Sequence, residues 1–305
     1  MIKKYLYNFF LKSFLRKKLY MIGLSHFLSV RKDYSNISLL SDVDYKVFSQ
    51  NGEDGILDYL LTSLSIENPK FLEIGVGDFT ECNTRFIFDR CSAKGTIIDC
   101  INNFEEKVKK NVELWKGDLK IINKKINTEN IHDLIENSDC FLDLDIFSLD
   151  IDGIDYWILN ELPENFSKIV VLEYNPLFGS NLEATVPNLP NFDRTSYHYS
   201  NLCFGMSLKA AINLMFKKNF YFVGTNLFKN NAFFVNNKFF KKKYFKNLQV
   251  KSIQYSVNSN FTESRSKDGS LNYLNKENRF KEILDCEVVD LSNNNKINKI
   301  KDLLK

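Results

Sequence analysis

Short apolar runs alternate with amphipathic stretches between residues 70 and 237 of this 305-residue chain. Runs rich in Ile, Val, Leu and Phe predict strands at residues 71–75, 95–99, 119–126, 146–151, 169–173, 221–224 and 232–236. Stretches with helical spacing predict helices at residues 81–91, 103–115, 129–136, 154–162 and 208–218. Strand and helix therefore alternate along most of this region.

The order of these elements predicts a fold class. Strands that are joined through helices form parallel pairs with right-handed crossovers. The runs at 146–151 and 169–173 are apolar enough to be buried on both faces. The last two strands are too close together for a crossover helix and should form an antiparallel hairpin. We expect an α/β, Rossmann-like domain at residues 45–237, with a mostly parallel seven-stranded sheet and a C-terminal antiparallel strand.

The N-terminal extension, residues 1–44, mixes aromatic and basic side chains. Charges interrupt its apolar residues, so it contains neither the roughly 20 apolar residues of a membrane span nor the core of a signal peptide. Two interpretations remain open for residues 1–30. They form a basic helix that lies on an anionic membrane surface or packs on a partner, or they form a helix docked on the protein's own domain.

The C-terminal extension, residues 238–305, is rich in Lys and Asn, and we interpret its charge runs mainly as a solvated face. A formal net charge of +3 is too small to predict a nucleic-acid partner. The chain lacks C-x-x-C pairs, which argues against a structural zinc site or a disulfide framework. Reduced thiols fit a cytoplasmic protein better. The six cysteines are Cys82, Cys91, Cys100, Cys140, Cys203 and Cys286.

The clearest chemical motif is the turn after the first strand, where Glu73 precedes Gly75, Val76 and Gly77. Glycines allow a tight turn and a close approach of the backbone to a ligand, and amides at the next helix start can receive a polar group. A dinucleotide-binding fingerprint needs a third glycine where this chain has Thr80, so the NAD motif fails. The alternative is a glycine turn that binds no ligand.

Asp99 ends the next predicted strand. A carboxylate at this position can accept hydrogen bonds from both hydroxyls of a ribose. Its distance along the chain from Glu73 suits one intervening helix. We expect Asp99 to contact a cofactor, with a helix cap as the alternative.

Two carboxylates follow the fourth strand in the segment 148–155. Alternation places Asp150 and Asp152 on the same side of the chain. Such a pair can bind a divalent cation, orient a substrate hydroxyl or act as a general base with a raised pKa. A second interpretation for Asp152 is the N-cap of the helix at 154–162. A cap does not explain Asp150.

The fifth strand ends with Glu173 and Asn175, which we expect to face the same crevice. A carboxylate after four apolar residues is costly unless it is paired, coordinated or exposed. The long segment 177–204 follows and has the length of a lid or binding loop. It contributes Arg194, Tyr197 and His198. Of the three histidines only His198 has a route to the site, where it could take a proton; an ordinary surface histidine is the alternative.

Several blocks of residues stand in a characteristic order between about Tyr45 and Asn236. The first blocks are Phe48-Ser49-Gln50-Asn51-Gly52-Glu53-Asp54-Gly55, the turn Glu73–Asp78 and Glu81-Cys82-Asn83-Thr84. The middle blocks are Leu149-Asp150-Ile151-Asp152-Gly153, Asp155-Tyr156-Trp157 and Leu172-Glu173-Tyr174-Asn175-Pro176. The last are Thr185-Val186-Pro187, Ser207-Leu208-Lys209-Ala210 and Asn231-Ala232-Phe233-Phe234-Val235. In this order the blocks resemble those of FkbM-like S-adenosylmethionine-dependent methyltransferases.

The resemblance implies a class I methyltransferase fold, S-adenosylmethionine as cofactor and O-methylation. Methyltransferases place an acidic residue near the end of the first strand, as Glu73 does here. Members of the family often accompany surface-polysaccharide biosynthesis, which implies a sugar hydroxyl as the acceptor. One departure is Phe79, where many relatives have a further glycine; we expect its ring to narrow the methionine end of the pocket.

We therefore expect methyl transfer to an oxygen of a nucleotide-linked or surface-glycan sugar. The expected cofactor contacts are Gln50, Glu73, Gly75, Val76, Gly77, Asn83 and Asp99. The expected catalytic residues are Asp150, Asp152, Glu173 and His198, and the expected acceptor contacts are Asn175, Arg194 and Tyr197. A divalent cation, if one takes part, would bind Asp150 and Asp152. The rival hypotheses are an inactive module that binds a glycan or a partner, and a nucleotide-sugar oxidoreductase.

Overall fold

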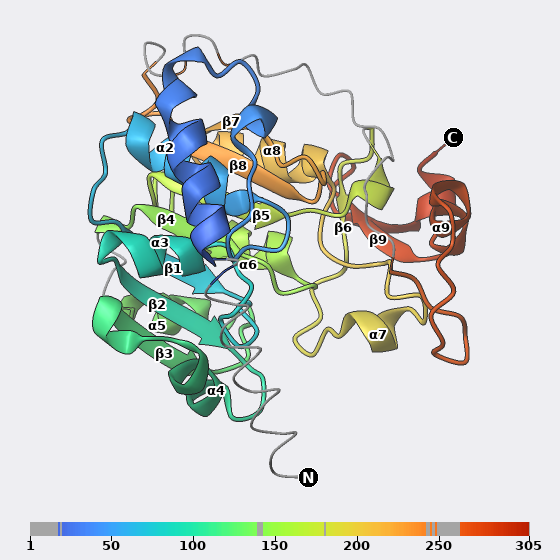
Figure 1. Cartoon of the computed structure of the whole chain (residues 1–305). Coiled ribbons are helices and arrows are strands. Elements are labelled where there is room, and N and C mark those ends of the chain that lie inside the picture. The colour runs from blue at the N-terminus through green and yellow to red at the C-terminus, as the bar shows by residue number, and fades with distance from the viewer. Residues whose placement is uncertain are drawn as a thin grey trace.

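The computed structural model describes residues 18, 20–138, 143–179, 181–241, 245, 248 and 263–304. A seven-stranded sheet forms its centre, with the strand order β3-β2-β1-β4-β5-β8-β7 (Figure 1). The strands are β1 (Lys70–Ile74), β2 (Lys94–Asp99), β3 (Asp118–Asn123), β4 (Ile146–Leu149), β5 (Ile169–Glu173), β7 (Phe220–Thr225) and β8 (Asn231–Asn236). All seven expected strands are present.

Strand directions follow the expected pattern. β1 to β5 pair in parallel, whereas β8 runs antiparallel to both β5 and β7. The predicted fold class is therefore confirmed. The chain builds β1 to β3 outward in one direction and then returns to the centre for β4. This reversal between β1 and β4 is where open α/β sheets bind ligands, beyond the carboxyl ends of the strands.

Helices precede, separate and follow these strands. After a helical segment at residues 20–30 come α2 (Glu53–Ser63), α3 (Arg85–Cys91), α4 (Phe104–Asn111), α5 (Ile131–Glu136), α6 (Asp155–Glu161), α7 (Arg194–Tyr197), α8 (Leu208–Lys217) and α9 (Lys276–Glu282). The 3-10 helices are η1 (Arg31–Asn36), η2 (Leu40–Val43), η3 (Leu114–Lys116), η5 (Pro176–Phe178) and η6 (Ile300–Asp302). The five expected helices are found, although α3 starts four residues later than the expected residue 81.

Alternating residues of the strands build two cores, one on each face of the sheet. Phe71 of β1 packs in the core that α2, α3 and α4 cover, whereas its neighbour Leu72 packs in the core under α5, α6 and α8. The central strands are buried on both faces, which explains why their sequences are continuously apolar.

The described part of the N-terminal extension docks on the domain. Residues 20–30 are helical, and Phe27 is 2% exposed, with its ring centroid 5.4 Å from that of Phe86 on α3. Leu40 and Val43 are also buried in this core. For residues 20–30, the structure therefore shows the docked helix. Residues 1–17, which carry most of the basic charge, lie outside the described residues. Among the described helices none combines the length and apolar character that crossing a membrane requires.

The C-terminal extension is not a solvated tail over residues 276–303, and that expectation is corrected. A second sheet joins β6 (Ala184–Thr185) of the long loop to β9 (Glu287–Asp290), which pairs with β10 (Lys296–Lys299) (Figure 1). Ile283, Val288 and Ile300 are fully buried in the core that α6 and α8 also share. Their apolar side chains are spaced among Lys and Asn residues, so average composition concealed them. One of the charge runs of this extension is Lys241–Lys243, of which Lys242 and Lys243 lie outside the described residues.

Candidate functional site

A cavity of about 490 Å³ opens at the carboxyl ends of β1, β2 and β4, where the strand order reverses. Its volume falls within the usual range for small-molecule sites. The residues predicted as cofactor contacts come together here, and Asp150 and Asp152 join them. Those that line the cavity are Gln50, Glu73, Gly75, Val76, Gly77, Asn83, Asp99, Asp150 and Asp152.

The two glycines of the turn are required for different reasons. A Cβ on Gly75 would lie 1.6 Å from the carbonyl oxygen of Asp150, because β1 and β4 approach each other closely there. Gly77 has φ +58°, and a Cβ on it would meet nothing within 4 Å. Its requirement is therefore conformational. Together they form a turn whose backbone stays accessible from the cavity.

Glu73 holds the loop that leads into α3. Its carboxylate accepts hydrogen bonds from the backbone N–H of Asn83 (2.8 Å) and of Thr84 (2.9 Å), and from the hydroxyls of Thr84 and Ser148. Burial raises the pKa of Glu73, and these donors oppose the shift. Residues 81–84 bend toward this carboxylate, which explains why α3 begins at Arg85.

Asp99 braces the turn from the neighbouring strand. Its Oδ2 accepts a hydrogen bond from the backbone N–H of Gly77 at 2.7 Å, and its Oδ1 accepts one from Ile101 at 3.0 Å. Its side chain is half-buried in the cavity wall. Each carboxylate oxygen can accept a second hydrogen bond. Asp99 can therefore support the glycine turn and bind a ligand hydroxyl at the same time.

Phe79 does not narrow the pocket, and this expectation is corrected. The residue has φ +61° and is fully buried. Its ring stacks on Phe71 with centroids 6.4 Å apart, and the guanidinium of Arg85 lies 5.6 Å from its centroid. The positive φ turns the ring into the core on the α2–α3 side of the sheet, away from the cavity.

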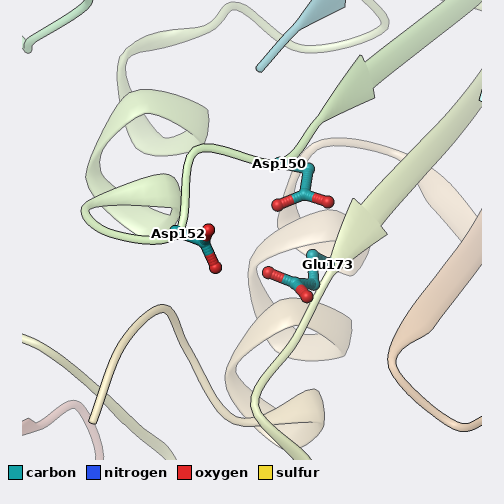
Figure 2. Close-up of side chains that lie close together, drawn as sticks. All are labelled: Asp150, Asp152 and Glu173. Atoms are coloured by element: carbon teal, nitrogen blue, oxygen red, sulfur yellow. The ribbon is translucent and has the colours of Figure 1, made fainter. Parts of the chain in front are cut away.

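Three carboxylates converge beyond β4 and β5. Figure 2 shows Asp150, Asp152 and Glu173 pointing toward one another, and they offer oxygens that all lie within 4.8 Å of one another. Burial raises the pKa of both Asp150 and Glu173, and repulsion between the carboxylates adds to the effect. A hydrogen bond joins the two carboxyl groups, which share one proton between them. The pair therefore retains a proton at pH values well above the ordinary pKa range of a carboxyl group.

Arg194 reaches this cluster from α7 in the long loop. Its Nη1 donates to Oδ1 of Asp152, and its Nε donates to the carbonyl oxygen of Asn201 at 3.0 Å. The guanidinium carbon also lies 4.2 Å from the ring centroid of Phe204. The loop thus brings one positive charge to the three carboxylates, where it pairs with Asp152.

Asp152 is not a helix cap, so that alternative is wrong. The N-cap of α6 is Ile154, and Asp155 satisfies the preceding turn by accepting from the backbone N–H groups of Ile151 and Gly153, each at 2.9 Å. Asp152 itself has φ +54°. The turn thus places the Asp152 side chain beside Arg194 and the other carboxylates.

Three expected site residues occupy other positions, and none of them lines the cavity. Asn175 is buried, and its amide donates to the carbonyl oxygens of Leu202 and Phe204, so it holds the long loop. The hydroxyl of Tyr197 donates to the carbonyl oxygen of Glu287 at 2.6 Å. His198 lies 2.7 Å from the Ser200 hydroxyl and also hydrogen bonds with Cys286. Contacts of the loop with the C-terminal strand region turn Tyr197 and His198 away from the cavity.

Residues that were not singled out also line the cavity. Lys124, Lys125 and Ile126 follow β3, Phe192 comes from the long loop, and Asn231 begins β8. The general rule for strand ends indicates the three residues after β3. Asn231 was easier to predict from sequence, because it is a polar residue directly before the apolar run Ala232-Phe233-Phe234-Val235.

No protein-family model matches this chain, and no curated protein sequence matches it either. Among solved structures, it is similar to an O-methyltransferase family protein from Burkholderia thailandensis, with 10% identity over 59% of this chain and 54% of that one (TM-score 0.38). It is also similar to human N-acetylserotonin methyltransferase in complex with SAM, with 12% identity over 58% of this chain and 50% of that one (TM-score 0.33). A third similar structure is spermidine synthase from Thermotoga maritima, with 12% identity over 77% of this chain and 73% of that one (TM-score 0.33). The chain spans between about half and two thirds of the length of the first structures that it matches.

Proposed function

We propose that the protein is an S-adenosylmethionine-dependent O-methyltransferase that acts on a sugar hydroxyl of a nucleotide-linked or surface-glycan precursor. One observation carries the proposal. The turn at Gly75 and Gly77, braced by Asp99, and the carboxylates Asp150 and Asp152 line one cavity at the point where the strand order reverses. We propose that a nucleoside site and an acid–base site lie next to each other there.

The cavity fits this cofactor at its nucleoside end. The half-buried Asp99 carboxylate can accept hydrogen bonds from ribose hydroxyls, and Gly77 leaves space beside the turn. When bound, S-adenosylmethionine supplies an activated methyl group. The residues of the chain then have two tasks, which are to align the acceptor oxygen with that group and to accept one proton.

Asp150 is the residue we propose for the proton. It lies beyond β4, lines the cavity and shares a hydrogen bond with Glu173. Its raised pKa brings it closer to the operating range of a general base. Arg194 and Asp152 form an ion pair beside it, and we propose that this pair orients the acceptor. His198 faces Cys286 and is not needed for this step.

A divalent cation is the second version of this site. The three carboxylates offer ligand atoms within 4.8 Å of one another, and Mg²⁺ and Ca²⁺ favour such oxygens. The Arg194 guanidinium and the proton shared by Asp150 and Glu173 already reduce the negative charge of the cluster. We therefore favour the metal-free version. A chelator separates the two, because only a metal-dependent enzyme loses activity that an added divalent cation restores.

Calorimetric titration with S-adenosylmethionine and with NAD tests the cofactor, and a methyl-transfer assay tests the activity. We expect binding of the first cofactor only. Nucleotide sugars incubated with both protein and cofactor should gain one methyl group, which mass spectrometry detects. NAD binding would favour the oxidoreductase instead. Binding of a glycan without methyl transfer to any sugar of the panel would favour the inactive module.

For its setting in the cell, we propose a cytoplasmic protein that binds no nucleic acid and touches the inner face of the membrane through residues 1–30. The support is the basic and aromatic sequence of this segment and two apolar side chains, Met21 and Ile22, that are 60% and 66% exposed on the docked helix. Sedimentation with vesicles tests the proposal. Binding should require anionic lipid and weaken as salt increases.

A further inference from the structure

Asn231, the first residue of β8, carries a polar atom that no other described residue satisfies. The residue is 4% exposed and lines the cavity. Its Nδ2 donates to Oε1 of Glu53 at 2.7 Å. Its Oδ1 is buried and accepts no hydrogen bond from the described part of the chain. Buried polar atoms usually have partners, so this exception needs an explanation.

The orientation of the Asn231 amide is fixed by Glu53. The same carboxylate accepts from Nδ2 of Asn226 (2.7 Å) and from the backbone N–H of Asn51 (2.9 Å). Turning the amide over would place its carbonyl oxygen against the Glu53 carboxylate and lose a hydrogen bond. Oδ1 is therefore held as an acceptor, and only a group with an N–H or O–H can satisfy it.

The surroundings of Asn231 favour a cationic donor. Asn231 lies opposite Glu173 in the antiparallel register of β5 and β8. Two residues along the same strands, Val171 and Phe233 pack in the same core, so Glu173 and Asn231 project from the same face of the sheet. The acidic cluster that includes Glu173 lies next to this end of the cavity. Negative charge and a fixed carbonyl oxygen together are complementary to an ammonium group.

We infer that Oδ1 of Asn231 accepts a hydrogen bond from the α-ammonium group of S-adenosylmethionine, which makes Asn231 a determinant of cofactor specificity. The inference rests on the proposed function and deepens it. Because this oxygen has almost no surface open to water, the cavity wall must shift slightly on binding. A charge-assisted hydrogen bond is strong enough to offset such a shift.

Two related nucleosides test the inference by calorimetry. S-adenosylhomocysteine keeps the ammonium group, whereas methylthioadenosine lacks the whole amino-acid part. Asn231→Ala should weaken binding of the first by about 10- to 100-fold, the usual range for a hydrogen bond to a charged group. The affinity for methylthioadenosine should stay unchanged. Asn231→Asp keeps an acceptor oxygen but loses the donor to Glu53, so it should retain affinity for S-adenosylhomocysteine.

The two variants separate binding from structure. Both lose the hydrogen bond to Glu53, so a purely structural role predicts equal losses with both variants and with both nucleosides. That result, or an Asn231→Ala variant with normal affinity for S-adenosylhomocysteine, overturns the inference. Thermal unfolding checks each variant, and Asn231→Ser replaces the alanine variant if that one does not fold. If the unmodified protein binds neither nucleoside, the proposed function itself fails, which is a distinct result.

Discussion

Asp150 and Glu173, at the carboxyl ends of the neighbouring strands β4 and β5, share a hydrogen bond between two carboxyl groups. Two half-buried carboxylates this close cannot both ionise cheaply, so one of them retains a proton. We assign the proton to Glu173 and the accepting oxygen to Asp150, because Asp150 lines the cavity whereas Glu173 does not. This arrangement assigns different tasks to two chemically similar residues, because only the ionised one can take a proton from a substrate.

Replacing Asp150 by Asn tests this assignment. If Asp150 takes the proton from the substrate hydroxyl, Asp150→Asn should lower kcat by roughly 100-fold or more, because general-base catalysis contributes that much. The affinity for S-adenosylmethionine should change far less. Steady-state kinetics and calorimetry measure the two effects, and thermal unfolding shows whether the variant is folded. A folded variant with near-normal kcat would exclude Asp150 as the base.

The pH dependence of kcat should carry the signature of the pair. Since burial and the neighbouring carboxylates raise the pKa of Asp150, activity should rise with pH at values above the ordinary carboxyl pKa of about 4. At higher pH, Glu173 loses its proton and no longer donates to Asp150, so activity should fall again.

Glu173→Gln provides the matched control for this profile. Its amide still donates to Asp150 but cannot titrate. We expect the variant to keep the rise at low pH and to lose the fall at high pH. A profile with both limbs intact in Glu173→Gln would show that the alkaline limb belongs to another group. Because the two carboxyls are coupled, the measured values describe the pair.

Asp99→Ala should weaken binding of S-adenosylmethionine by about 1–3 kcal/mol, the cost of losing hydrogen bonds from buried polar groups. The loss has two sources, because Asp99 also accepts from the backbone N–H of Gly77. Asp118→Ala is a suitable control, since Asp118 lies at the opposite end of neighbouring β3 with its side chain 70% exposed. Calorimetry that finds equal affinity in both variants would remove Asp99 from the site.

Much of the sheet and half of the site could be predicted from local sequence. Central strands are recognisable because burial on both faces makes them continuously apolar, and strand ends then locate Asp99 and Asp150. His198 and Tyr197 were misplaced for a different reason. Their orientation depends on β6 pairing with β9, about 100 residues later in the chain, and no local pattern reports such a pairing. Asn175 failed similarly, because its partners are backbone carbonyls of the same folded loop.

Phe79 tests how a bulky side chain is accommodated at a backbone position that favours glycine. Its ring is fully buried against Phe71 and Phe88, yet its backbone has φ +61°, which favours glycine. Loss of a buried phenylalanine ring costs about 3–5 kcal/mol, whereas relief of a left-handed backbone returns about 1–2 kcal/mol. Phe79→Gly should therefore lower the free energy of unfolding by roughly 1–4 kcal/mol, measured by urea denaturation.

The same variant decides whether the ring affects the cavity. Because Phe79 points into the core and is absent from the cavity wall, the folded variant should bind S-adenosylmethionine with unchanged affinity. Phe88→Ala is the control, since Phe88 packs on Phe79 from α3 at a centroid distance of 6.1 Å but has an ordinary helical backbone. Phe88→Ala should lower the free energy of unfolding by the full cost of about 3–5 kcal/mol, because its backbone is not strained and no strain is relieved. Tighter cofactor binding by Phe79→Gly alone would show that the ring narrows the pocket after all.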